Sequence, residues 1–326
     1  MKQIGDEELA VIAEVARMYY IEGMSQLDIA NMLFFSKAKV SRALRIAREE
    51  GIVEFHINYP LKRSMRLESE LKRRFGLQEA LVVTDLYSNQ NTDISIKRIG
   101  EMAASYLDEI LKDGDTIGLS WGRTMYQTVR QLNPTSPRKI QVVQLVGNST
   151  DAYNSQELDV TTLVQRMAQA FQGSATMLYA PMYINSDIVR RELMKEQLIQ
   201  KALEKINGVD YVLTGIADVA LDRPLSTWAG YLTEQKKREL MKKGAVGYIC
   251  GYFFDRDGNK LLDSINDKII GISFEKLKKG PRVIAAAGGV DKTHAICGAL
   301  RGRLIDCLIT DSRIAEKLMG MQGGLG

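Results

Sequence analysis

Three glycine-rich segments of the sequence carry residue types that bind phosphate. Segment 118–124 (GLSWGRT) combines two glycines with a serine, an arginine and a threonine. Segments 214–218 (TGIAD) and 287–293 (AGGVDKT) follow later, and the last of them contains Lys292. Small residues let the backbone approach an anion, and the free N–H groups at a helix start favour negative charge. Together the three segments predict a site for a phosphorylated small molecule.

Segment 118–122 also spells G-x-S-x-G, the nucleophile elbow of serine hydrolases. In that alternative Ser120 is the nucleophile and His294 is its base. We rank it below ligand binding, because His294 would lie in the first turn of a predicted helix, where a base is poorly placed to reach a serine. A hydrolase would also leave the N-terminal part of the chain without a role.

We expect no metal ion and no cofactor. The sequence has two histidines, too few for a convincing zinc site. Segment 255–259 (DRDGN) resembles the start of a calcium loop but lacks the closing glutamate, so we predict a hairpin turn at Asp257-Gly258. The three cysteines, Cys250, Cys297 and Cys307, have no paired spacing, which fits a reducing cytoplasm.

The segment from Ser25 to Arg48 predicts a second kind of binding site. Ser25 and Ser36 can each cap a short helix, and the second helix would run from Lys37 to about Glu50 and end at Gly51. Phe34 and Phe35 would fill the corner between the helices, where a glycine is common. This layout is typical of a helix-turn-helix, whose second helix enters the DNA major groove. The candidate DNA contacts are Ser25, Gln26, Lys37, Lys39, Ser41, Arg42 and Arg45.

The elements that would position these residues fall into three parts. Residues 1–59 form the DNA-binding domain, with a supporting helix over 6–22 and a strand over 52–59 that we interpret as a wing. Residues 60–77 form a basic linker helix. From residue 78 to 326, apolar runs alternate with helical stretches, one of them over 186–205. This alternation predicts an α/β domain with a mostly parallel sheet, which binds its ligand at the carboxyl ends of the strands. The runs are 80–84, 115–120, 140–146, 175–180, 210–216, 245–251, 282–287 and 306–310.

The composition is that of a globular protein with a local basic region. The 326 residues are 45% apolar and carry a formal net charge of +4. Residues 37–74 hold 11 Lys and Arg against 5 Asp and Glu, an excess of 6 near the predicted helix-turn-helix. No apolar run approaches the roughly 20 residues of a membrane span, and no signal peptide opens the chain. We therefore expect a cytoplasmic protein with double-stranded operator DNA as a partner and no membrane partner.

Five segments carry a resemblance to a known family: 25–53 (SQLDIANMLFFSKAKVSRALRIAREEGIV), 113–129 (DGDTIGLSWGRTMYQTV), 208–218 (GVDYVLTGIAD), 244–258 (GAVGYICGYFFDRDG) and 283–311 (VIAAAGGVDKTHAICGALRGRLIDCLITD). In this order they resemble the SorC family of bacterial sugar-responsive transcriptional regulators over nearly the whole chain. The resemblance implies a C-terminal domain with a fold like glucosamine-6-phosphate deaminase and ribose-5-phosphate isomerase. It also implies a phosphorylated sugar effector and assembly as a homo-oligomer, either a dimer or a tetramer.

The resemblance also implies the effector contacts. Residues 120–124 would hold the phosphate, and Lys292 would approach from the facing loop. Tyr248 stands where many members have an acidic residue that bonds a sugar hydroxyl, which indicates a different or shorter sugar. The deaminases carry a catalytic histidine in a glycine-rich loop, but the matching segment 215–222 has no histidine. We therefore expect the sugar phosphate to bind without turnover. A sugar-phosphate isomerase or deaminase stays the alternative. The full set of candidate contacts is Gly118, Ser120, Trp121, Gly122, Arg123, Thr124, Gly147, Asn148, Gly215, Tyr248, Gly289 and Lys292.

Overall fold

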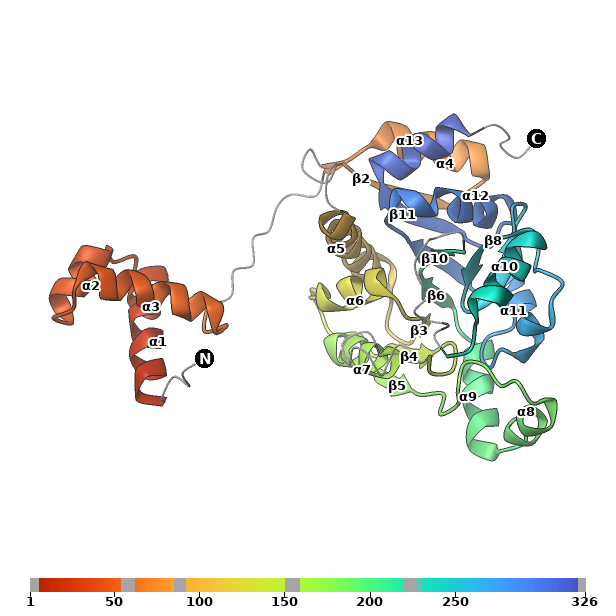
Figure 1. Ribbon diagram of the computed structural model, residues 1–326, viewed down its shortest axis with the longest axis horizontal. Helices are drawn as coiled ribbons and strands as arrows, with labels where there is room; N and C mark the ends of the chain where they lie inside the picture. The colour runs from red at the N-terminus through yellow and green to blue at the C-terminus, as the bar shows by residue number, and fades with distance from the viewer. Residues whose placement is uncertain are drawn as a thin grey trace. The chain divides into compact units, whose positions relative to one another are not determined.

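The computed structural model of the chain describes residues 6–53, 62–84, 92–149, 159–219, 228 and 230–321 (Figure 1). The chain divides into two compact units, residues 1–60 and residues 61–326. Among the described residues, no helix has both the length and the apolar character that crossing a membrane requires. Most of the strand expected over 52–59 lies outside the described residues, and each unit is described by itself below.

The described part of the first unit contains three helices: α1 (Asp6–Tyr20), α2 (Gln26–Met32) and α3 (Lys37–Glu49). The side chains of Ser25 and Ser36 accept hydrogen bonds from the N–H groups of Asp28 and Lys39, so both predicted caps are present. Each cap satisfies one N–H group that has no partner within its helix. The apolar faces of the three helices meet in one core, made by Ile12, Val15, Ala16, Met18, Ile29, Ala30, Val40, Ala43, Leu44 and Ala47.

The corner between α2 and α3 differs from its prediction at one residue. Phe34 does not fill the corner: its side chain is 95% exposed. Its φ angle is +54°, a left-handed conformation that a β-carbon disfavours and that glycine adopts freely. Phe35 does pack against the core, and Lys39 Nζ lies 3.6 Å from the centre of its ring.

The second unit is built on an eight-stranded sheet with the strand order β1-β2-β11-β10-β6-β3-β4-β5. All neighbouring pairs are parallel except β1 with β2, which confirms the predicted mostly parallel sheet. The strands are β1 (Lys62–Arg63), β2 (Glu79–Thr84), β3 (Thr116–Leu119), β4 (Gln141–Gln144), β5 (Ser174–Thr176), β6 (Tyr211–Thr214), β10 (Arg282–Ala286) and β11 (Cys307–Asp311).

Helices cover both faces of this sheet, as Figure 1 shows. One apolar core joins the sheet to α5, α6 and α7, and the other joins it to helices that include α4, α9, α12 and α13. The helices described in this unit are α4 (Met65–Phe75), α5 (Thr92–Ile110), α6 (Arg123–Arg130), α7 (Val160–Ala170), α8 (Asp187–Leu193), α9 (Gln197–Asn207), α10 (Glu234–Lys242), α11 (Phe274–Lys279), α12 (Thr293–Arg301) and α13 (Ser312–Gly320), together with the 3₁₀ turns η4 (Ser264–Lys268) and η5 (Val290–Lys292).

A second, three-stranded sheet was not predicted. It has the order β7-β8-β9, with β7 (Ala217–Asp218), β8 (Ala245–Ile249) and β9 (Tyr252–Asp255) paired antiparallel. The apolar run over 245–251 is therefore not a strand of the parallel sheet. Cys250 and Gly251 both have positive φ angles, +48° and +83°, and reverse the chain between β8 and β9. This is the backbone of a tight hairpin turn.

Two predicted helices have different bounds. The linker helix begins at Met65 rather than near residue 61, because Lys62 and Arg63 form the edge strand β1, which pairs with β2. This helix, α4, contacts β2 and α13 and belongs to the second unit. The helix expected over 186–205 is divided into α8 and α9, because Ser186 caps a first helix that ends before residue 197.

Candidate functional site

The glycine-rich loops meet at one edge of the large sheet. Strand β6 lies between β3 and β10, and β4 follows β3. Because these four strands run parallel, the residues after them emerge at the same edge. Loops 120–124, 214–218 and 287–293 thus lie next to one another, together with residues 147–148. The tertiary structure therefore brings together segments that are up to about 170 residues apart in the sequence.

The loop after β3 leads directly into helix α6. Gly122 occupies the N-cap position with a φ angle of +131°, and within the described residues no side chain caps this helix. Gly122 has no side chain to accept from the first N–H groups of α6, which is an arrangement that favours an anion. Arg123 is exposed and lies 3.4 Å from Asp93 of α5, Nη1 to Oδ1. Thr124 is buried, and its carbonyl accepts a hydrogen bond from Thr128.

Ser120 lies beneath this loop rather than on its surface. It is 3% exposed, and its hydroxyl donates to Thr214 Oγ1 at 2.8 Å. Cys250 also contacts Thr214, with its Sγ 3.5 Å from the same oxygen. Burial raises the pKa of the Cys250 thiol to about 11, so it is protonated at neutral pH. His294 is exposed on α12, and the Ser120 hydroxyl is engaged by a threonine, so this arrangement lends no support to a hydrolase.

Two of the candidate glycines are explained by close packing. A β-carbon at Gly118, inside β3, would lie 2.2 Å from Leu145 Cδ2. A β-carbon at Gly147 would lie 2.5 Å from the carbonyl oxygens of Ala180 and Pro181. Position 147 therefore requires glycine whether or not a ligand binds, because the clash is with backbone, and at position 118 the Leu145 side chain would have to move to admit a β-carbon.

The remaining loop positions differ in how open they are. Gly215 follows β6, and among the described residues a β-carbon there would meet only the Ala286 carbonyl oxygen, at 4.0 Å. Gly289 precedes η5, and Lys292 ends this turn, where its side chain is partly exposed. Trp121 is also partly exposed and packs against both cores of the unit. Gly215, Trp121 and Lys292 are thus placed around the edge where the loops meet.

Asn148 and Tyr248 have clear packing roles. The Asn148 side-chain oxygen accepts a hydrogen bond from Gln144 Nε2 at 2.7 Å, which fixes the end of β4. Tyr248 is 8% exposed in β8, and its ring lies 5.4 Å from that of Phe253. Trp228 is fully buried against Phe253. Tyr248 is therefore mainly part of the apolar core.

Sequence reasoning missed Asp93 and Cys250 as neighbours of the loops. Asp93 lies in the first turn of α5, next to a segment with no glycine-rich pattern. Cys250 is brought to Thr214 by the unpredicted β8–β9 turn. The sequence carries no local signal for either contact, because each depends on the packing of a distant element.

The first unit exposes its basic residues on α3. Lys37, Lys39, Ser41, Arg42 and Arg45 are all exposed, whereas Val40, Ala43, Leu44 and Ala47 of the same helix are buried. Ser25 is exposed and Gln26 is partly exposed at the start of α2. The Arg45 guanidinium lies 3.4 Å from Glu49 one turn later. The outward face of α3 is thus polar and mainly basic.

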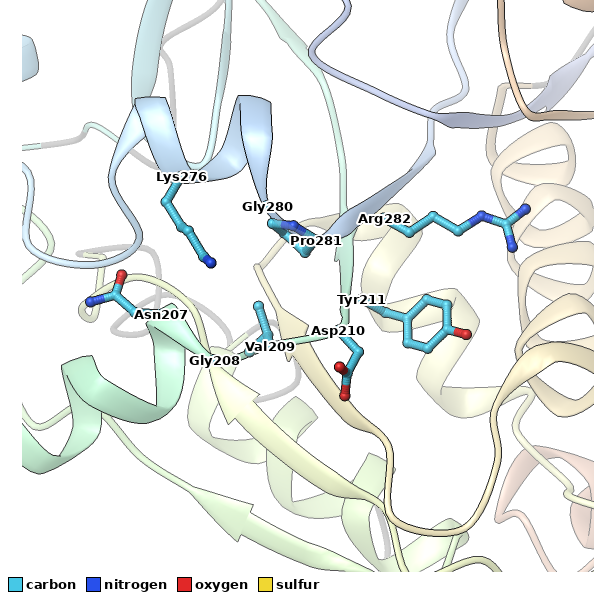
Figure 2. Close-up of a pocket in the computed structure, with 9 residues that line it drawn as sticks. All are labelled: Asn207, Gly208, Val209, Asp210, Tyr211, Lys276, Gly280, Pro281 and Arg282. Carbon is cyan, nitrogen blue, oxygen red and sulfur yellow. The ribbon is translucent and has the colours of Figure 1, made fainter.

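A separate hollow of about 420 Å³ lies at the amino ends of β6 and β10, the edge opposite the glycine-rich loops (Figure 2). Lys276 of α11 points toward the segment before β6. The Arg282 side chain extends away from that segment. Asp210 accepts a hydrogen bond from the Thr116 N–H at 2.9 Å, and Arg282 donates to the Tyr106 hydroxyl at 2.7 Å. The polar groups at this edge therefore stabilise the sheet.

No group of three or more metal-ligating side chains is found in the part of the chain that the structure describes. The calcium-like segment forms the predicted turn: Asp255 Oδ1 accepts hydrogen bonds from the N–H groups of Asp257 and Asn259, both at 2.9 Å. Phe254 and Lys260 pair antiparallel across this turn. The hairpin prediction is confirmed.

Comparison with known proteins identifies the class. A family model described as "Putative sugar-binding domain" matches residues 59–320. The chain is 36% identical over 317 residues to the deoxyribonucleoside regulator of Bacillus subtilis, covering 96% of this chain and 98% of that protein. It is 30% identical over 314 residues to the sorbitol operon regulator of Klebsiella pneumoniae, again covering 96% and 98%. The crystal structure of the full-length Klebsiella regulator superposes with a TM-score of 0.72 and 28% identity, covering 96% of this chain and 100% of that chain.

These matches define a transcriptional regulator with a sugar-binding domain. The chain belongs to the SorC family of sugar-responsive transcriptional regulators.

Proposed function

We propose that this chain binds operator DNA through residues 1–59 and senses a phosphorylated sugar at the edge where the glycine-rich loops meet. The observation that carries the proposal is the adjacency of loops 120–124, 214–218 and 287–293 at the carboxyl edge of one parallel sheet. Ligands of such sheets bind at this edge. The names of two relatives refer to a sorbitol operon and to deoxyribonucleosides, which supports a small carbohydrate-containing effector.

The phosphoryl group would be held by the start of α6. The N–H groups there have no side-chain cap, and Arg123 and Lys292 supply positive charge nearby. In the structure Arg123 faces Asp93 across 3.4 Å, with both side chains at least half exposed. An exposed pair of this kind contributes little, about 0–1 kcal/mol, so a bound phosphate can replace Asp93 as the partner of Arg123.

DNA would be bound by α2 and α3 acting as a helix-turn-helix. Helix α3 presents Arg42 and Arg45 on its exposed face, where a guanidinium can contact guanine with two hydrogen bonds. Lys37 and Lys39 in its first turn can contact phosphates. Effector binding would shift the regulator between arrangements with different operator affinity. Operator binding places the protein in the cytoplasm.

A thermal-shift screen against phosphorylated and free sugars tests the effector site. A ligand at 100 times its Kd raises the free energy of unfolding by about 2.7 kcal/mol. We expect phosphorylated sugars to raise the melting temperature and their free counterparts to have no effect. A sugar phosphate that binds should then change the affinity for the chain's own upstream DNA, measured by fluorescence anisotropy. Stabilisation by free and phosphorylated sugars alike would contradict the phosphate site.

The alternative function is a sugar-phosphate isomerase or deaminase. The second unit is predicted to resemble such enzymes, and they also bind a sugar phosphate. We propose binding without turnover, because segment 215–222 has no histidine to match the catalytic residue of the deaminases. Consumption of any sugar phosphate in the same screen, measured by ³¹P NMR, would reverse this ranking.

We also propose a homo-oligomer, either a dimer or a tetramer. Helix α8 has no buried residue within its own subunit, and Ile188 and Val189 on it are 67% and 55% exposed. Leu198, on the next helix, is 61% exposed. A seven-residue helix is not stable in water by itself, so a covering partner would explain this apolar surface.

A further inference from the structure

Three buried polar side chains form a continuous chain beneath the glycine-rich loops. Ser120, Thr214 and Cys250 are 3%, 0% and 4% exposed. The Ser120 and Thr214 hydroxyl oxygens are 2.8 Å apart, and Cys250 Sγ lies 3.5 Å from Thr214 Oγ1. The three residues come from the ends of β3 and β6 and from the β8–β9 turn. We refer to them as the buried hydroxyl–thiol chain.

The directions of these hydrogen bonds follow from the available hydrogens. Thr214 has one hydroxyl hydrogen, which it donates to the Gly215 carbonyl oxygen at 3.1 Å. A carbonyl only accepts, so Thr214 must accept from both the Ser120 hydroxyl and the Cys250 thiol. The Ser120 hydrogen is thus turned inward to Thr214. A phosphoryl oxygen needs a donor, so Ser120 in this arrangement does not offer one to a ligand.

The backbone at Cys250 supports a specific role for its thiol. Cys250 has a φ angle of +48° in a two-residue turn where asparagine or glycine is the usual residue. A non-glycine residue in this conformation is strained and persists only when its surroundings hold it there. In the described part of the chain, the Cys250 side chain makes a polar contact with Thr214.

We propose that Thr214 and Cys250 are positioning residues of the effector site, and that Ser120 acts within the buried hydroxyl–thiol chain rather than as a phosphate ligand. The inference rests on the proposed function and deepens it. The chain fixes loop 120–124 against loop 214–218, so that the N–H groups at the start of α6 are already oriented when the phosphoryl group arrives. Donors that are fixed in advance lose less entropy on binding.

A double-mutant cycle tests the assignment with inorganic phosphate as the probe. Affinities are taken from the melting temperature of the full chain in rising phosphate concentration. We expect Thr214→Val and Ser120→Ala each to weaken phosphate binding roughly 3- to 10-fold, and the double variant to bind no more weakly than either alone. Thr214→Ser keeps the hydroxyl and should restore the affinity. If Ser120→Ala weakens binding while Thr214→Val does not, Ser120 is a ligand and the proposal is wrong.

Hydrogen exchange without ligand tests the same chain independently. We expect Thr214→Val and Cys250→Ala to speed amide exchange in both loops, 120–124 and 214–218. Cys250→Ala keeps the β-carbon and its backbone strain and removes only the sulfur, and Cys250→Ser restores a donor and should restore slow exchange. Unchanged exchange in Thr214→Val would overturn the proposal. Faster exchange in the variants, together with no phosphate response in the wild-type chain, would overturn the proposed function and leave the buried hydroxyl–thiol chain supported.

Discussion

The carboxylate of Glu68 accepts two parallel hydrogen bonds from the Arg63 guanidinium, from Nε and from Nη2, both at 2.9 Å. Glu68 is 4% exposed, and its Oε1 also accepts a hydrogen bond from the Val82 N–H at 2.9 Å. Arg63 lies in β1, just after the boundary between the two units at residues 60 and 61. This ion pair therefore fixes the first residues of the second unit to the edge of its sheet.

Glu68→Gln should destabilise the second unit by about 1–3 kcal/mol, because it removes a charge-assisted pair and weakens the bond to Val82. Urea unfolding followed by tryptophan fluorescence measures this, since both tryptophans lie in that unit. Glu70→Gln is the matched control: its ion pair with Arg66 is exposed and should contribute less than about 1 kcal/mol. Equal effects of the two variants would contradict a special role for Glu68.

Arg42→Ala should weaken operator binding by about 1–3 kcal/mol and relax base preference at one position. Arg48→Ala is the matched control, because Arg48 lies in the last turn of the same helix, away from the predicted base contacts. It should weaken binding less and change no base preference. Fluorescence anisotropy on the chain's upstream DNA and on single-base variants measures both. Equal loss on every sequence with Arg42→Ala would argue against base recognition.

Phe34→Gly should stabilise the first unit by about 0.5–1 kcal/mol, because it removes a left-handed β-carbon at a side chain with little packing. Phe35→Ala, one residue later, should have the opposite effect, since Phe35 packs against the core and Lys39. Native-state hydrogen exchange of the α1–α3 amides in the full chain measures both changes. Slower exchange in Phe35→Ala, or faster exchange in Phe34→Gly, would show that the corner is held differently.

Asp263 should make the stability of the second unit pH-dependent in acid. Burial alone would raise its pKa, but hydrogen bonds from Lys243, Lys236 and the Ile265 N–H outweigh burial and lower it to about 2, from 3.8. A carboxyl whose pKa is lower in the folded state contributes stability above its unfolded pKa. This contribution, about 2 kcal/mol, is therefore present above pH 4 and is lost as the pH falls from about 4 to 2.

Asp263→Asn should flatten this acid dependence, which urea unfolding at a series of pH values between 2 and 6 would show. Asp267→Asn is the control, because the Asp267 side chain is 69% exposed beside Lys260. It should leave the pH dependence close to that of the wild-type chain. An unchanged slope in Asp263→Asn would mean that other carboxylates account for it.

Ile188→Glu should shift the chain toward a smaller species in sedimentation velocity, because it places a charge on the uncovered face of α8. Leu262→Glu is the control: Leu262 is 93% exposed and lies on the segment after β9, away from α8 in the sequence. It should not change the sedimentation coefficient. A wild-type chain that sediments as a monomer would refute the proposed oligomer.

Much of the fold could be read from local patterns. The caps Ser25 and Ser36 were predictable because a side-chain oxygen and a backbone N–H three residues later form the bond. The parallel strands were predictable because short, mainly apolar runs alternate with helical stretches along the chain. Two features were missed: the pairing of Lys62–Arg63 with β2, and the β7-β8-β9 sheet. Both are antiparallel pairs of short segments, and their positions depend on where the strands of the larger sheet end.

The sequence by itself determined which residues could bind: the glycines, Arg123 and Lys292 of the loops, and the arginines spaced along one face of α3. Local spacing is enough for this, since it fixes helix faces and strand ends. Only the tertiary structure decided that Ser120 is buried against Thr214, that Arg123 faces Asp93, and that Tyr248 belongs to the core. These outcomes depend on contacts between segments far apart in the chain, which no local pattern encodes.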